Sequence, residues 1–156
     1  MLATPRDFSR FPWMQFAFQE YGQAERSGVT DNARIVQYLA SVGLASENDE
    51  TPWCAAFVNW CLLQARAPRT RLANARSFLA GWDGQCLSRP SYGCIVVFTR
   101  PPNPLQGHVA LYTGPSGGDL LVLGGNQANK VCLKPYPAMA VLGYRLPAGF
   151  EPAYGL

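Results

Sequence analysis

The hydrophobic period of this chain changes once, near Gly93, from a helical repeat to a strand repeat. Before Gly93, apolar residues recur at intervals of three and four, which is the spacing of one helix face. After it, short apolar runs are separated by Pro, Gly and Asn turns at intervals of about ten residues. Helices followed by a run of strands favour an α+β domain with an antiparallel sheet.

Helices are expected over residues 12–22, 31–43 and 51–63, with a shorter one over 72–82. The first has Pro near its start and Gly at its stop, and the second has an Asp or Asn cap. The third opens on Thr-Pro, which suits a cap followed by the first helical position. The strands are expected at 94–99, 108–113, 120–123, 131–133 and 141–145, making a sheet of about five strands.

The composition narrows the class of protein. A length of 156 residues fits one domain, and 48% apolar with 15% charged residues is globular rather than disordered. The net charge of +3 comes without a Lys/Arg run, so no nucleic-acid partner is expected. No stretch approaches the roughly 20 apolar residues of a membrane span. No basic and apolar leader opens the chain, so we expect synthesis in the cytoplasm without a Sec signal.

The five cysteines are an odd number with no C-x-x-C pair, and the chain has one histidine. This pattern argues against a structural zinc site, and we expect neither metal nor cofactor. Most of the cysteines are expected to be buried free thiols, because Cys is among the most often buried residue types.

Cys54 is the first candidate for chemistry, because it falls in the first turn of the third expected helix. The unpaired N–H groups and positive dipole end of a helix start favour a thiolate over a thiol. A thiolate is what a cysteine nucleophile needs near neutral pH. The alternative interpretation is a core cysteine, which is how we interpret Cys61, two turns further along the same face.

His108 is the one histidine available as a general base near pH 7. A third group would orient its ring, as in a Cys–His–Asn arrangement. Asn126 ends the next strand, where a meander brings it beside His108, although Gly-Gly-Asn is also ordinary turn chemistry. Gln127 is a second candidate for this position. For the oxyanion hole, the Cys54 N–H needs one side-chain donor, for which the candidates are Gln127, Asn32 and Tyr112.

Seven segments together resemble a known bacterial and phage family. They are residues 31–39 (DNARIVQYL), 50–61 (ETPWCAAFVNWC), 75–77 (ARS), 95–98 (IVVF), 107–110 (GHVA), 124–127 (GGNQ) and 142–145 (LGYR). This set is similar to the NlpC-type and CHAP branches of the papain-like peptidases, from about residue 12 to 146. One departure is Tyr-Gly-Cys at 92–94, where the family often has Pro-Gly-Asp. Cys94 is therefore either buried or paired with Cys86.

The resemblance implies a papain-like α+β fold in which the helix that carries the nucleophile packs on an antiparallel sheet. It implies metal-free hydrolysis of a peptidoglycan amide through a thioester, with Cys54 as nucleophile, His108 as base and Asn126 as the orienting residue. The whole chain, 1–156, would be one catalytic domain. Trp53, Arg76 and Ser77 flank the groove in the family pattern and are candidate substrate-binding residues.

The expected partner is the peptidoglycan stem peptide, with cleavage inside the peptide slightly preferred over the muramoyl–L-alanine amide. Two other functions stay open, an acyltransferase or transpeptidase on the same fold and an inactive wall-binding domain. The expected setting is the periplasm or cell wall, reached by a secretion system or by phage lysis. An injected effector would need a cognate immunity protein in its producer. We expect a monomer.

Overall fold

The computed structural model describes residues 8–26, 31–45, 47–48 and 52–154. Three α-helices precede the sheet: α1 (Pro12–Gln19), α2 (Ala33–Ala40) and α3 (Cys54–Gln64). Two short 3-10 helices, η1 (Ala75–Leu79) and η2 (Ala138–Ala140), lie between later elements. The strands are β1 (Gly84–Leu87), β2 (Ile95–Thr99), β3 (Gly107–Ser116), β4 (Asp119–Gln127), β5 (Lys130–Pro137) and β6 (Val141–Pro147).

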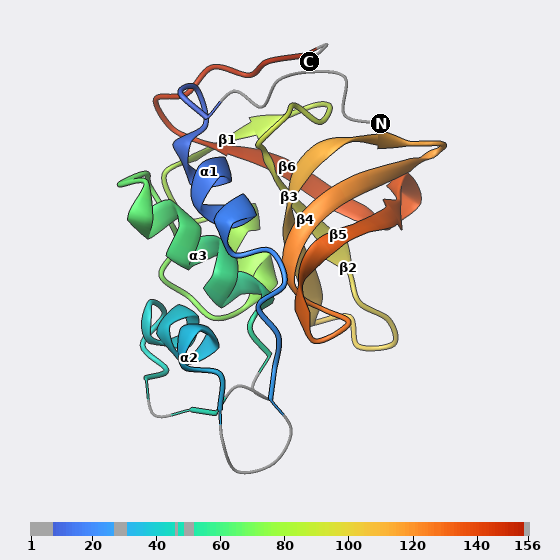
Figure 1. The fold of residues 1–156 in the computed structure, drawn as a ribbon. Coiled ribbons are helices and arrows are strands. Elements are labelled where there is room, and N and C mark those ends of the chain that lie inside the picture. The colour runs from blue at the N-terminus through green and yellow to red at the C-terminus, as the bar shows by residue number, and fades with distance from the viewer. Residues whose placement is uncertain (1–7, 27–30, 46, 49–51, 155–156) are drawn as a thin grey trace.

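The expected α+β class is confirmed, with six strands instead of about five. The antiparallel sheet has the order β1-β6-β2-β3-β4-β5, so β2 to β5 form a meander and β6 returns beside β2. The helices lie to one side of this sheet (Figure 1). The edge strand β1 was not predicted, because its sequence, GQCL, has neither a β-branched residue nor a clear alternation.

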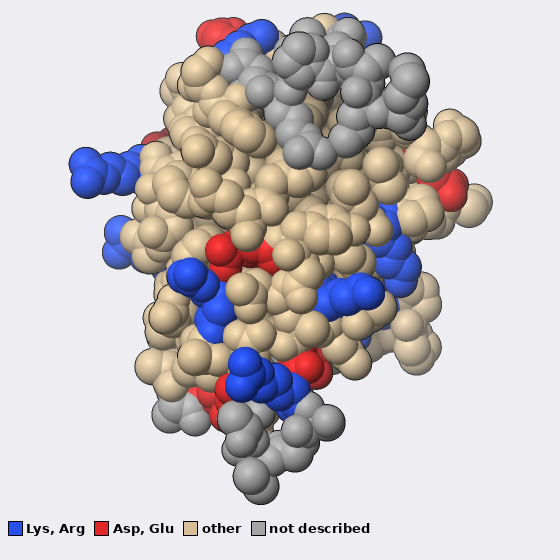
Figure 2. Space-filling model, viewed as in Figure 1, with Lys and Arg blue, Asp and Glu red and all other residues tan. Residues whose placement is uncertain are grey.

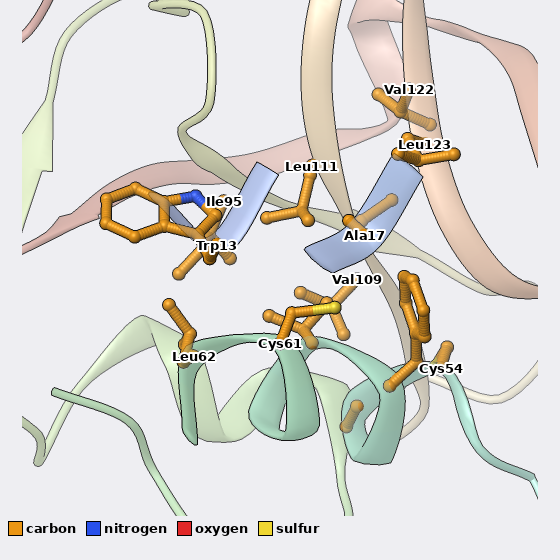
Figure 3. Packing of buried hydrophobic residues seen from close by; sticks show 14 of the residues in the cluster. Trp13, Ala17, Cys54, Cys61, Leu62, Ile95, Val109, Leu111, Val122 and Leu123 are labelled. Carbon is orange, nitrogen blue, oxygen red and sulfur yellow. The ribbon is translucent and has the colours of Figure 1, made fainter. Parts of the chain in front are cut away.

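Helix α3 is the centre of the core. Every residue from Cys54 to Leu62 is buried, which is the pattern of a helix covered on all sides. Val109 and Leu111 of β3 lie on its sheet side (Figure 3), and α1 and α2 also pack against it. Helix α3 is therefore covered from Cys54 to Leu62, whereas Leu63 and Gln64 at its end are exposed.

The start of α3 differs from the prediction. The cap is Trp53, whose side chain makes no capping hydrogen bond, and Cys54 is the first helical residue. Pro52 therefore precedes the helix instead of opening it, and Thr51 lies outside the described residues. The shorter helix expected over 72–82 is the five-residue 3-10 helix η1.

The five cysteines all lie in the described ranges and are free thiols. Four of them are buried, as expected, and Cys86 is exposed. Cys94 is buried in the core, so the structure favours burial over a pair with Cys86. Within the described part of the chain, no helix has the length and hydrophobicity that crossing a membrane would require.

Candidate active site

Cys54 is the first residue of α3, and 5% of its surface is exposed. Burial raises the pKa of its thiol. The backbone N–H groups of Val109 and Ala55, and the charge of Arg100, act in the opposite direction. The sulfur is thus held as a neutral thiol with thiolate-stabilising donors around it, and it needs a base to be activated.

His108 is the base candidate, and it directly precedes Val109, whose N–H reaches the Cys54 sulfur. The His108 side chain is 7% exposed. Burial lowers its pKa to about 4, against a smaller raising effect of Gln127, and the cations Arg100 and Lys134 lower it further. At neutral pH the imidazole is therefore uncharged and able to accept a proton.

Gln127 orients the His108 ring. Nε2 of His108 lies 2.9 Å from Oε1 of Gln127, and Nε2 of Gln127 donates to the Cys132 carbonyl oxygen at 2.7 Å. Because the amide nitrogen is committed to Cys132, the amide oxygen faces the ring and must accept from it. The proton of the neutral imidazole is therefore on Nε2, and Nδ1 carries the free lone pair.

This geometry corrects the prediction for Asn126. The pairing of β4 with β5 shifts between Gly124 and Gln127, and Asn126 sits in the shifted stretch with a left-handed φ of 58°. The extra residue of a bulge breaks the alternation of side chains, so the buried side chain directed at His108 is that of Gln127. Asn126 is half-buried and lines the cleft next to the ring without bonding to it.

The two glycines before Asn126 provide space rather than a turn. A Cβ on Gly124 would collide with Oε1 of Gln127, and one on Gly125 would collide with Phe57 and Trp53 of the α3 region. Glycine at these two positions lets Gln127 fold back towards His108 and lets β4 approach the start of α3.

Aromatic rings hold His108 from a third side. Its ring stacks on Tyr136 of β5 with centroids 5.1 Å apart, and Tyr136 stacks on Phe98 of β2 at 4.7 Å. In the sheet order β5 is separated from β2 by β3 and β4, so the sheet curls to bring these rings together. Burial raises the pKa of Tyr136 to about 12, with a further contribution from Cys54. Tyr136 thus lies near both members of the pair.

Two surface clefts adjoin the pair. One, of about 320 Å³, contains Cys54 together with Asn74, Leu105 and Gln106. The other, of about 370 Å³, contains His108, Asn126, Lys134 and Tyr136. Arg100 lines both clefts, so it marks where a substrate passing between them would lie. Such a pair of clefts fits an extended chain better than a compact small molecule.

The three predicted substrate-binding residues do not line these clefts. Trp53 is fully buried, and its Nε1 donates to Glu25 at 2.9 Å, so the prediction that it faces the substrate is wrong. Ser77 shares a 2.9 Å hydrogen bond with Thr70. Arg76 donates from Nε to the Gln106 carbonyl at 2.9 Å and so fixes the wall of the Cys54 cleft.

Two of the oxyanion candidates, Asn32 and Tyr112, do not line the Cys54 cleft. Asn32 caps α2, where its Oδ1 accepts from Arg34 and Ile35. Its Nδ2 donates to Gln23 and to the Ala24 carbonyl, so its amide is committed. Tyr112 lies four residues along β3 from His108 and pairs with Val122, and the pKa of its phenol is raised by burial and by the nearby Cys94 and Tyr144.

Sequence reasoning missed Arg100, Lys134 and Tyr136 as site residues. Arg100 had a usable signal, since it follows strand β2, whose last residue pairs with the neighbour of His108. Lys134 and Tyr136 had none, because their positions depend on the curl of the sheet. Asn74 and Gln106, which line the cleft with Cys54, were also missed, and both lie in loops that no motif singled out.

Comparison with known proteins agrees with this geometry. The family model of the CHAP domain matches residues 46–126, just over half of the chain. The matched segment contains Cys54 and His108 and ends one residue before Gln127. A search of the curated proteins found no match. CHAP domains are typically cysteine- and histidine-dependent amidohydrolases or peptidases, and the family match indicates peptidoglycan as substrate. The chain belongs to the CHAP domain family.

Proposed function

We propose that this protein hydrolyses an amide bond of the peptidoglycan stem peptide, with Cys54 as nucleophile and His108 as general base. The observation that carries the proposal is the hydrogen-bond chain from Cys132 through Gln127 to Nε2 of His108. It leaves Nδ1 of a neutral imidazole free, on the residue next to the Val109 N–H that reaches the Cys54 sulfur.

The reaction begins when Nδ1 of His108 takes the thiol proton and the Cys54 sulfur attacks the amide carbonyl carbon. The negative charge that develops on the carbonyl oxygen is stabilised by the Cys54 N–H at the start of α3. The imidazolium then donates its proton to the leaving amine as the carbon–nitrogen bond breaks. Water, losing a proton to Nδ1, attacks the thioester and releases the carboxylate and the thiol.

Asn74 and Gln106 are the side-chain amides that line the cleft with Cys54. We propose that one of them is the second donor to the oxyanion, in place of Asn32 and Tyr112. This keeps the oxyanion hole on the Cys54 side of the pair, while Gln127 serves the His108 side.

Within this class we favour cleavage inside the stem peptide over cleavage of the muramoyl–L-alanine amide. Clefts on both sides of the pair support a substrate that continues as peptide in both directions. Purified sacculi treated with wild type and with Cys54→Ala test the reaction. Mass spectrometry should find new amine and carboxyl ends within stem peptides for the wild type alone. Identical muropeptide profiles would refute hydrolysis, and free intact stem peptides would show the amidase instead.

We propose that the protein acts in the cell wall as an antibacterial effector or a phage lysin. A peptidoglycan substrate supports this, because the polymer lies outside the cytoplasmic membrane. Expression in a Gram-negative host with and without an added periplasmic leader tests the location. Lysis should require both the leader and an intact Cys54. Lysis caused equally by Cys54→Ala would show toxicity unrelated to hydrolysis.

A further inference from the structure

We propose that Arg100, with Lys134, forms a subsite for a free carboxylate of the substrate beside the Cys54–His108 pair. This inference rests on the proposed peptide substrate and specifies its charge. The subsite favours stem peptides in which the carboxyl group next to the scissile amide is free, and it disfavours peptides in which that group is amidated.

The charge of the two clefts is the first observation. Arg100 lines both clefts and Lys134 lines the one with His108, whereas no Asp or Glu of the described residues lines either. The active-site region therefore presents cations alone to a bound chain. On the face seen in Figure 2, Asp and Glu side chains lie among the Lys and Arg side chains.

The second observation is that neither cation has an anionic partner among the described residues. Among the described residues, neither Arg100 nor Lys134 has an ion pair or a hydrogen bond from its side chain; Lys134 lies over the Tyr136 ring, 5.3 Å from its centroid. Three other arginines have partners: Arg76 and Arg145 donate to backbone carbonyls, and Arg34 pairs with Glu20 at 3.1 Å. The Arg100 guanidinium therefore keeps its planar set of donors for a ligand, and a carboxylate matches them.

The third observation is the reach of the Arg100 charge. It lowers the pKa of Cys54, of His108 and of Tyr136, so it acts on the nucleophile, the base and the ring that packs on the base. A carboxylate bound to Arg100 would therefore lie close to the reacting amide. In a stem peptide, a carboxyl group close to the reacting amide belongs to a residue that forms the scissile bond or to its neighbour.

The test uses one synthetic stem peptide with all carboxyl groups free and a set in which each is amidated in turn. Wild type should lose about tenfold in kcat/KM on amidation of one particular group, the scale of one charge-assisted hydrogen bond. Arg100→Gln should abolish this difference, and Arg100→Lys should retain part of it. Arg66→Gln, at the opposite end of α3, removes the same charge and should discriminate like the wild type.

Two results would overturn the subsite. One is a wild type that cleaves all the peptides equally. The other is an Arg100→Gln variant that lowers kcat/KM for every peptide by the same factor, because Arg100 would then act only through the pKa of Cys54. Binding of the same peptides to Cys54→Ala and to Cys54→Ala/Arg100→Gln, measured by calorimetry, removes the nucleophile from the comparison.

The binding experiment also separates this inference from the proposed function. If no peptide is cleaved but Cys54→Ala binds the free carboxylate about tenfold more tightly through Arg100, the hydrolase proposal fails and the subsite stands. If peptides are cleaved but Cys54→Ala binds free and amidated peptides with equal affinity, the hydrolase proposal stands and the subsite is refuted.

Discussion

His108 and Gln127 lie 2.9 Å apart, from ring Nε2 to amide Oε1, and the Gln127 amide is itself held by the carbonyl of Cys132. A glutamine thus takes the place in which a Cys–His–Asn arrangement has its asparagine. The two residues come from adjacent strands, β3 and β4, so the sheet itself sets the tautomer of the base.

Gln127→Ala should lower kcat on sacculi at least tenfold, the usual effect of losing a hydrogen-bond partner that orients a reactive imidazole. Asn126→Ala is the matched control, one residue away and lining the same cleft. It should retain activity within about threefold, since Asn126 does not bond to the ring. Release of soluble muropeptides from sacculi measures the activity of both variants. The opposite ranking would return the orienting role to Asn126.

Stability should fall on acidification because of His108. Its pKa is lowered to about 4 by burial, whereas an ordinary histidine titrates near 6.5. Between these values the unfolded chain binds a proton that the folded chain excludes, so unfolding becomes easier as pH falls through this window. At pH 4.5 the loss is about 2 to 3 kcal/mol relative to pH 7.

Urea unfolding of wild type and His108→Gln at these two pH values checks this prediction. Carboxyl groups titrate in both proteins, so the difference between them isolates the imidazole. A wild type no more acid-sensitive than His108→Gln would contradict a depressed pKa. The same shift places the acid limb of kcat/KM near pH 4, because catalysis needs the neutral ring.

Tyr136 should act as a positioning residue through its ring. Tyr136→Phe keeps the stack on His108 and on Phe98 and should retain activity within about threefold. Tyr136→Ala removes the stack and should lower kcat about tenfold while raising the pKa of His108, because water then reaches the imidazole. NMR titration of the one histidine measures that pKa directly. Loss of activity in Tyr136→Phe would instead show that the hydroxyl takes part.

Arg76→Ala should act on the wall of the Cys54 cleft. The guanidinium anchors the Gln106 carbonyl, so its loss should reduce stability by about 1 kcal/mol and raise KM through the loosened loop. Thermal unfolding and sacculus digestion measure the two effects. Arg66→Gln, an exposed substitution beyond the end of α3, should change neither. A raised KM with an unaltered melting temperature would restore the direct substrate role.

The order of elements was predictable from the sequence because it depends on local patterns. The helical repeat, the strand repeats and the turns between them are properties of neighbouring residues. The same holds for the position of Cys54 at a helix start and for His108, since there is one histidine. The protonation state of Cys54 depended on packing instead, because burial raises the pKa of its thiol. Edge strand β1 and the length of η1 escaped prediction, because tertiary contacts define them more than propensity does.

The orienting residue depended on the tertiary structure. From the sequence, Asn126 was the predicted orienting residue and Gln127 the second candidate, both at the end of a strand. The bulge in β4, the space left by Gly124 and the carbonyl of Cys132 decide for Gln127. None of these is visible without the neighbouring strand, because a bulge is defined by the pairing of two strands.

The surroundings of the pair were decided by the curl of the sheet. Tyr136 and Lys134 reach His108 because β5 folds back over strands that are not its neighbours. A local pattern carries no information about such a contact. The sequence by itself thus determined the fold class and singled out Cys54 and His108 as the candidate nucleophile and base. The tertiary structure decided what orients the base, what shields it from water and which charged side chains line the clefts beside it.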